Sequence, residues 1–153
     1  MSAMVDAPDL DQLLCYAVHS ADLAFNRVYR LVLQRLNLTY PQYLVMIALW
    51  GEDDVTVGRL GERLSLDTNT LTPLLKRLEA LGLLTRQRSK ADERRVMVAL
   101  TEQGRGMQRE AEGVPHCIAQ DTGLPAADLA RLASELRVLR TNLERAASER
   151  AAR

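Results

Sequence analysis

The sequence has few aromatic residues, few cysteines and no long apolar run. Aromatic side chains make up 4% of the 153 residues, so the core must consist mainly of Leu, Val and Ala, which favours helices. The longest wholly apolar run covers eight residues, 43–50, whereas a membrane span needs ~20. The first residues also lack the basic and apolar regions of a signal peptide. We therefore expect a cytoplasmic protein without a membrane partner.

Two cysteines in a cytoplasmic chain do not make a disulfide framework. Together with two histidines at scattered spacing they predict no metal site, and we expect no cofactor. If Cys15 or Cys117 has a chemical role, redox chemistry is the expected one. The chain length corresponds to a single domain, residues 1–153.

The net charge is zero, but the charges are unevenly distributed. Residues 1–56 carry three Arg and seven acidic residues, whereas residues 57–95 carry nine Lys or Arg and five acidic residues. Residues 96–153 carry eight of each. A basic central third on an otherwise acidic or balanced chain is expected for a module that faces phosphates.

Apolar periodicity predicts helices on both sides of a short region of strands. The expected helices cover residues 10–36, 40–50, 57–64, 68–81, 102–119 (interrupted near 113–115) and 124–153. Thr39, Thr56 and Thr101 are expected as N-caps, and Gly82 just after the end of the helix at 68–81. After Gly82 the period changes from 3.6 to 2, which predicts a hairpin of residues 83–100 with a polar, charged tip at residues 89–95.

Two short helices followed by a basic hairpin make a winged helix-turn-helix, expected over about residues 40–100. The fold class is therefore mainly α with a small β-hairpin wing. The flanking helices, at about residues 8–36 and 102–153, carry apolar stripes that a chain of this size cannot cover alone. We expect them to bury these stripes against a second copy, in a homodimer. A monomeric helical bundle is the alternative.

The second helix of this motif places polar side chains opposite its expected buried face, which consists of Leu71, Leu74, Leu75, Leu78 and Leu81. Short polar groups can reach base edges, and long cations can reach phosphates. These side chains are Asn69, Thr72, Lys76 and Arg77. A solvated helix face would have the same composition, but the hairpin favours DNA because cations crowd into it. They are Arg86, Arg88, Lys90, Arg94 and Arg95. Arg94, near the tip, is placed to enter a minor groove, with Asp92 holding its guanidinium.

Cys15 falls within the first expected helix, where an inert buried cysteine is the ordinary interpretation. His19 follows one turn later, close enough to donate a hydrogen bond to a thiolate. Tyr29 comes 14 residues after Cys15, roughly 21 Å along a helix. The two side chains can therefore meet only if the first helices of two chains pack antiparallel.

Several stretches resemble a known family of dimeric winged-helix regulators. LxxRLSLDTNTLTPLLKRLEALGLLTRQRS and DERRVMVALTEQG are similar to the MarR family. LCYAVHSA, LNLTYPQYLVMIALW and LDTNTLTPLLKRLE are similar to its organic hydroperoxide resistance regulators, the OhrR type. The resemblance covers roughly residues 8–112, and the final helical region matches only in length and apolar pattern.

The resemblance implies roles for both cysteines. Cys15 falls on the peroxide-reactive thiol, and Cys117 is placed like the resolving cysteine of a two-cysteine branch. Tyr29 and Tyr40 fall on two tyrosines that hydrogen-bond to the thiol from the partner subunit. His19 departs from the pattern, because family members often have a tyrosine there. An imidazole could serve a similar purpose.

The resemblance also places DNA contacts on the second helix of the motif and on the wing. Together with the cations above, the expected DNA-binding residues are Asp67, Thr68, Asn69, Thr70, Thr72, Pro73, Lys76, Arg77, Arg86, Arg88, Lys90, Asp92 and Arg94.

The expected function is a homodimeric repressor of transcription that binds double-stranded operator DNA, not an enzyme. An organic hydroperoxide, as inducer, would oxidise Cys15 and release the DNA. One alternative is a MarR-type regulator controlled by a small phenolic or other lipophilic ligand, with structural cysteines. Another is a thiol peroxidase using both cysteines, in which the basic wing would have no use.

Overall fold

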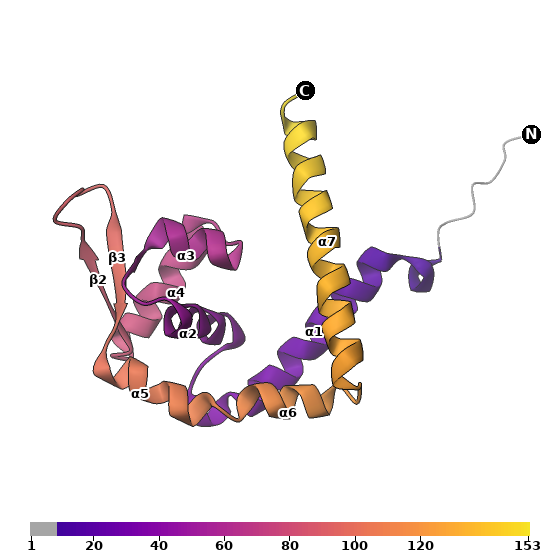
Figure 1. Cartoon of the computed structure of the whole chain (residues 1–153), viewed down its shortest axis with the longest axis horizontal. Coiled ribbons are helices and arrows are strands. Elements are labelled where there is room, and N and C mark those ends of the chain that lie inside the picture. The colour runs from indigo at the N-terminus through magenta and orange to yellow at the C-terminus, as the bar shows by residue number, and fades with distance from the viewer. Residues whose placement is uncertain (1–8) are drawn as a thin grey trace, which may run out of the picture. The chain divides into compact units, whose positions relative to one another are not determined.

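The computed structural model describes residues 9–153, which divide into two compact units. The first unit extends to Val114, and the second covers Pro115–Arg153. The elements of the first unit, shown in Figure 1, are η1 (Leu10–Gln12), α1 (Leu14–Val32), η2 (Gln34–Leu36), α2 (Tyr40–Gly51), β1 (Val55–Thr56), α3 (Val57–Leu64), α4 (Thr68–Ala80), β2 (Leu84–Arg88), β3 (Val96–Leu100) and α5 (Glu102–Ala111). Helix α6 (Val114–Asp121) begins at the boundary, and α7 (Ala126–Ala151) ends the second unit.

The three strands form an antiparallel sheet in the order β1-β3-β2. Strands β2 and β3 pair along their full length, from Leu84↔Leu100 to Arg88↔Val96, and form the predicted hairpin. Strand β1 adds two residues to the other edge of β3, with Val55 opposite Val98. The mainly helical fold with a small wing, expected from the sequence, is therefore confirmed.

Side-chain caps fix where the helices of the module begin. Thr39 and Gln42 form a capping box at α2, with Pro41 in the first turn. The Thr56 hydroxyl accepts a hydrogen bond from the Arg59 N–H at the start of α3. Gly82, with φ of 74°, adopts the left-handed conformation expected just after the end of α4. These helix boundaries follow the sequence prediction closely.

The single helix expected over residues 10–36 is wrong in its extent. Leu13 is extended (φ −83°, ψ 117°) and separates η1 from α1. At the other end the chain tightens into η2, and Asn37 takes a left-handed conformation with φ of 52°. Leu81, expected on the buried face of α4, is 37% exposed. Leu81 still donates its N–H to the Arg77 carbonyl at 3.0 Å and so keeps a helical position, but its side chain lines an open groove at the end of α4.

The core of the first unit lies between α2, α3, α4 and the sheet. Helix α2 is apolar on nearly all sides because neighbours surround it, which explains the continuous apolar run of residues 43–50. The largest fully buried side chains are Leu33, Val45, Met46, Leu49, Leu60, Leu71, Leu75, Leu78, Leu83, Leu84, Val98 and Val114.

The long helices α1 and α7 have no buried residue. The predicted apolar stripe of α1 leaves Leu14 61% and Leu31 69% exposed, and that of α7 leaves Leu136 45% exposed. No helix in the described part of the chain is long and apolar enough to cross a membrane. The two stripes are thus formed as predicted, and within this single chain they face outward.

Candidate functional site

Helix α4 presents its N-terminal turn to solvent. Asp67 is the N-cap, and its carboxylate accepts a hydrogen bond from the Thr70 N–H at 2.7 Å. That bond lowers the pKa of Asp67 below its ordinary value. Thr68, Asn69 and Thr70 are all exposed. The first turn therefore offers short polar side chains on a backbone fixed by its cap.

The middle of α4 carries the other predicted contact residues. The Thr72 hydroxyl donates to the Thr68 carbonyl at 2.7 Å, so its proton is already engaged within the helix. Pro73 lies inside the helix, one turn after its start, and has no N–H to donate. Lys76 and Arg77 are exposed on the side away from the buried leucines. This face combines short polar groups and long cations, as expected.

Arg86 on β2 does not extend freely into solvent. Its Nε and Nη2 atoms donate to Glu79 Oε2 at 3.0 and 2.7 Å, and its backbone N–H donates to Oε1 at 3.1 Å. The Arg86 guanidinium in turn lowers the pKa of Glu79 below its ordinary value. This pair joins the end of α4 to the base of the wing. Sequence reasoning missed Glu79, because its link to Arg86 depends on how the helix and the strand pack.

The wing tip differs from the prediction for Asp92. Asp92 Oδ1 accepts from the backbone N–H of Arg94 at 3.1 Å, and Oδ2 pairs with Arg95 Nε at 3.6 Å. Asp92 therefore holds the Arg94 backbone and the Arg95 side chain, not the Arg94 guanidinium. The reason is that the turn brings the Arg94 N–H, rather than its side chain, to the carboxylate. Arg94, Lys90 and Arg88 are exposed around the tip.

Cys15 is the second residue of α1 and is exposed, not buried as the inert interpretation would have it. The first turn of a helix is a position where the helix dipole stabilises negative charge. His19, one turn further along, is also exposed. Cys117 lies in α6, in the second unit, and is exposed as well.

An aromatic cluster joins α1 to α2 within the first unit. Tyr29 and Tyr40 stack with ring centroids 4.2 Å apart, and Tyr43 lies 6.0 Å from Tyr29. Burial, followed by the neighbouring Tyr40 and Tyr43, raises the pKa of Tyr29 to about 12. Burial and the nearby Asp22 carboxylate raise the pKa of Tyr40. Both phenols therefore keep their protons at neutral pH and remain hydrogen-bond donors.

A shallow groove lies between the start of α2 and the end of α4. Its volume is about 390 Å³, and it is lined by Asn37, Thr39, Gln42, Arg77, Ala80 and Leu81. Gln42 is the one buried polar side chain of the described core, and its Oε1 accepts from the Thr39 N–H. The groove thus lies beside a residue of the predicted DNA-binding face, Arg77.

Residues 27–110 match the family described as transcriptional regulator SarA/Rot. The chain is 45% identical over 138 residues to the HTH-type transcriptional regulator TtmR of Methylorubrum extorquens (strain PA1), covering 90% of this chain and 71% of that protein. It is 40% identical over 139 residues to the organic hydroperoxide resistance transcriptional regulator of Bacillus subtilis (strain 168), covering 91% and 95%.

Among solved structures, the chain is similar to AbfR of Staphylococcus epidermidis. Reduced AbfR bound to DNA superimposes with a TM-score of 0.74 at 33% identity, covering 88% of this chain and 94% of that chain. Disulfide-formed AbfR gives a TM-score of 0.64, covering 85% and 91%. The family match, the sequence relatives and the fold agree with one another. The chain belongs to the SarA/Rot family of transcriptional regulators, DNA-binding proteins with the winged-helix fold of MarR.

Proposed function

We propose that this regulator is a homodimeric repressor that senses organic hydroperoxides through Cys15 and releases operator DNA when oxidised. The observation that carries the proposal is the exposed Cys15 thiol in the first turn of α1. The name of the Bacillus subtilis relative and the existence of a disulfide form of AbfR support it. In this proposal, residues 40–100 bind DNA, and the helices within residues 8–36 and 102–153 form the dimer interface.

The proposed chemistry consumes one hydroperoxide for each disulfide formed between Cys15 and Cys117. The Cys15 thiolate attacks the peroxide oxygen distal to the organic group, the O–O bond breaks, and the alcohol leaves with a proton. Cys15 is then a sulfenic acid. The Cys117 thiol attacks its sulfur, and a disulfide forms with loss of water. We propose that the two cysteines belong to different subunits.

The proposed thiolate network uses Tyr29, Tyr40 and His19. Tyr29 and Cys15 lie on the same helix, roughly 21 Å apart along its axis, so Tyr29 can reach the thiolate only from the partner. The stacking of Tyr29 on Tyr40 supports a shared role, because it holds the two phenols side by side. Tyr29→Phe and Tyr40→Phe are expected to slow the alkylation of Cys15 in a Cys117→Ser background.

The decisive experiment measures DNA binding by the purified protein before and after cumene hydroperoxide, with and without a thiol reductant. Wild type should release the operator, and a non-reducing gel should show a covalent dimer. The dimer band should disappear in Cys15→Ser and in Cys117→Ser. If the oxidised protein stayed monomeric on the gel while releasing DNA, the intersubunit disulfide would be wrong. If Cys15→Ser still responded to the peroxide, the sensing role would be wrong.

The proposed DNA contacts are those of α4 and the wing, which in a symmetric dimer read two half-sites about one helical turn apart. Arg94→Ala should weaken binding by roughly tenfold or more, as expected for loss of a groove contact. Lys90→Ala should cost less and mainly reduce the salt dependence, because a phosphate contact releases counterions. Normal binding by Arg94→Ala would contradict the proposed docking of the wing.

A second candidate is control by a small phenolic or other lipophilic ligand, with Cys15 and Cys117 structural. The observation that favours it is the groove beside Arg77, where a bound molecule would contact the DNA-binding face. A Cys15→Ser protein that still released DNA on addition of its inducer would favour this candidate over the redox sensor.

A further inference from the structure

Two charged side chains hold the end of strand β3. Asp53 lies in the turn between α2 and β1, and its Oδ1 accepts from the Leu100 N–H and from the Asp54 N–H, both at 2.8 Å. Asp53 Oδ2 pairs with Arg105 Nη1 at 3.0 Å. The same Nη1 donates to the Leu100 carbonyl at 3.1 Å. Both backbone polar groups of Leu100 are therefore bound by side chains from outside the sheet.

The sheet topology explains why Leu100 needs these partners. Strand β1 pairs with β3 only at Met97 and Val98, so it ends before Leu100. On its other side β3 continues against β2, where Thr101 still donates to the Leu83 carbonyl. Asp53 and Arg105 thus supply the hydrogen bonds that a longer β1 would have made. Without them, two backbone groups at the base of the wing would lack a protein partner on this edge.

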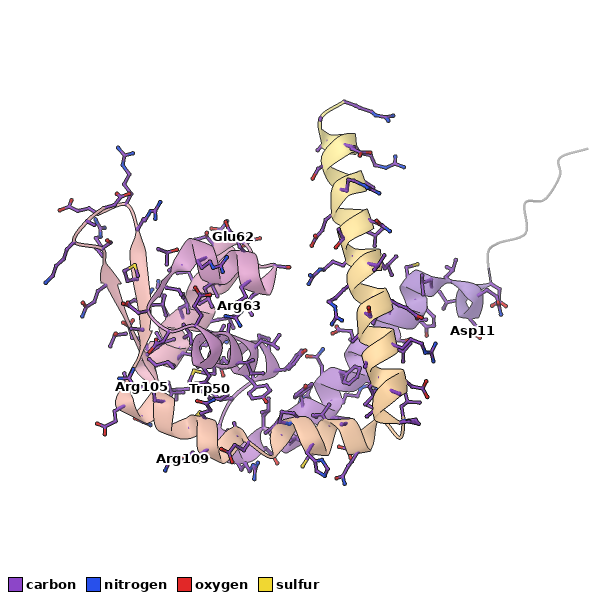
Figure 2. All side chains as sticks on the ribbon, in the orientation of Figure 1. Asp11, Trp50, Glu62, Arg63, Arg105 and Arg109 are labelled. Atoms are coloured by element: carbon purple, nitrogen blue, oxygen red, sulfur yellow. The ribbon has the colours of Figure 1, made fainter. Side chains whose placement is uncertain are left out.

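The first turn of α5 is fixed to the same place by close backbone packing. Trp50 Nε1, on α2, donates to the Gly104 carbonyl at 2.9 Å. A Cβ atom added to Gly104 would lie 1.9 Å from the Leu83 carbonyl oxygen, so only glycine allows this approach. Trp50 and Arg105 are labelled in Figure 2, where α5 meets α2 and the hairpin.

We infer that Asp53, Arg105, Trp50 and Gly104, here named the α5 joint, make the wing and the start of α5 move as one body. In this joint Asp53 is a positioning residue that sets the direction of the wing. The hairpin strands have five residues each, about 17 Å of length, so a rotation of about 10° at the base moves the tip by about 3 Å. That displacement exceeds the tolerance of a hydrogen bond.

The inference deepens the proposed function, because it rests on the wing contacting DNA. It also gives the dimer helices a route to the DNA-binding surface. Helix α5 is followed, after a turn at Glu112 and Gly113, by α6, which carries Cys117. Because the α5 joint holds the wing to the start of α5, a displacement of α5 would also displace the wing.

The test is a double-mutant cycle on operator affinity with fully reduced protein. Arg94→Ala should weaken binding by roughly tenfold or more in the wild-type background. In an Asp53→Ala background the same change should cost less than about threefold, since a misdirected wing has little contact left to lose. A loss of general stability would not produce this coupling. If the two penalties simply multiplied, the inference would be overturned.

Two control variants separate positioning from other effects. Glu52→Gln removes the neighbouring carboxylate, which pairs with Arg59 and Arg63 on α3 and, within the described residues, has no hydrogen bond or ion pair to β3 or α5. It should leave the full penalty of Arg94→Ala. Asp53→Asn keeps an acceptor for the Leu100 N–H but loses the ion pair with Arg105, so in this background Arg94→Ala should regain at least part of its full penalty. Equal behaviour of Glu52→Gln and Asp53→Ala would contradict a specific role of Asp53.

A second readout separates the inference from the proposed function. This readout is the operator Kd of the oxidised protein divided by that of the reduced protein. In wild type we expect a ratio of about 5–150, the usual range of allosteric coupling, and in Asp53→Ala the ratio should fall towards one. Mass spectrometry confirms equal oxidation of both proteins. An unchanged Kd ratio in Asp53→Ala would refute the inference about the α5 joint and leave the redox proposal standing. If the wild-type protein kept its DNA although Cys15 was oxidised, the redox proposal would be refuted. The double-mutant cycle with reduced protein would still test the inference about the α5 joint.

Discussion

The winged module buries its apolar side chains within its own chain, whereas the long helices α1 and α7 leave theirs exposed. Leu71, Leu75 and Leu78 on α4 are at most 1% exposed, whereas the leucines on the stripe of α7 are exposed or half-buried. Both sets follow the same helical spacing. An apolar stripe therefore indicates that a surface needs covering, but it does not indicate whether the cover comes from the same chain. Here the winged module buries its own apolar stripes, and we propose that a second copy of the chain covers those of α1 and α7.

The comparison predicts its largest effect for a buried leucine of the module. Leu75→Ala should lower the free energy of unfolding by about 2–5 kcal/mol, because it leaves a cavity in a filled core. Urea denaturation would measure the loss. Leu136→Ala, on the exposed stripe of α7, is the matched variant and should cost less once the dimer is diluted apart. An equal loss at every protein concentration would mean that α7 is covered within its own chain.

A charge placed on the apolar stripe of α7 tests whether a second copy of the chain covers it. Leu136→Asp should raise the dimer dissociation constant by roughly tenfold or more, because a carboxylate would be buried against apolar side chains. Sedimentation velocity over a concentration series would detect the shift. Ser134→Asp adds the same charge off the stripe and should leave the dimer intact. If both variants stayed dimeric, α7 would not lie in the interface.

A smaller effect is expected where the module holds its wing. Glu79→Gln should cost about 0.2–1 kcal/mol of stability, since the Glu79–Arg86 pair is partly exposed. The pKa of Glu79 is lowered in the folded state, so its contribution is present above the ordinary pKa of 4.5 and is lost as the pH falls through the folded value. Wild type and Glu79→Gln should therefore converge in thermal midpoint at low pH. Parallel curves across the whole acid range would contradict the ion pair.

The smallest effect concerns the contact between α1 and the winged module, and it can be detected only at alkaline pH. The pKa of Tyr29 is raised to about 12, so its contribution to stability is complete below pH 10 and is lost as the pH rises through about 12. An ultraviolet absorbance titration should show a late phenolate step, and Tyr29→Phe should remove it. A late step of unchanged size in Tyr29→Phe would assign it to another tyrosine.

Much of the architecture could be predicted because it depends on local signals. Thr39, Thr56 and Thr101 each cap the helix that the sequence assigned to them, and Gly82 ends α4 as expected. The change of period after Gly82 predicted the hairpin, and the fold and the family resemblance are confirmed. The roles of Cys15, Cys117 and the DNA-binding residues stay predictions.

Other features depend on contacts between distant elements. Glu79 binds Arg86 across the space between a helix and a strand, and Asp53 binds Leu100 from 47 residues away. Asp92 holds the Arg95 side chain rather than that of Arg94, because the path of the turn decides which group reaches the carboxylate. The extent of the first helix was overestimated, since an apolar stripe continues through the breaks at Leu13 and Leu33.

The order of the elements, their caps and turns, and the positions of their apolar faces can all be read from the amino-acid sequence. These properties follow from residues within a few positions of one another, where hydrogen bonds and side-chain periodicity act locally. In contrast, the folded structure is needed to know which polar groups meet at the base of the wing and which apolar stripes are buried within the chain. Those outcomes depend on the packing of elements far apart in sequence, because a charged or apolar side chain accepts any complementary partner that the fold brings within reach.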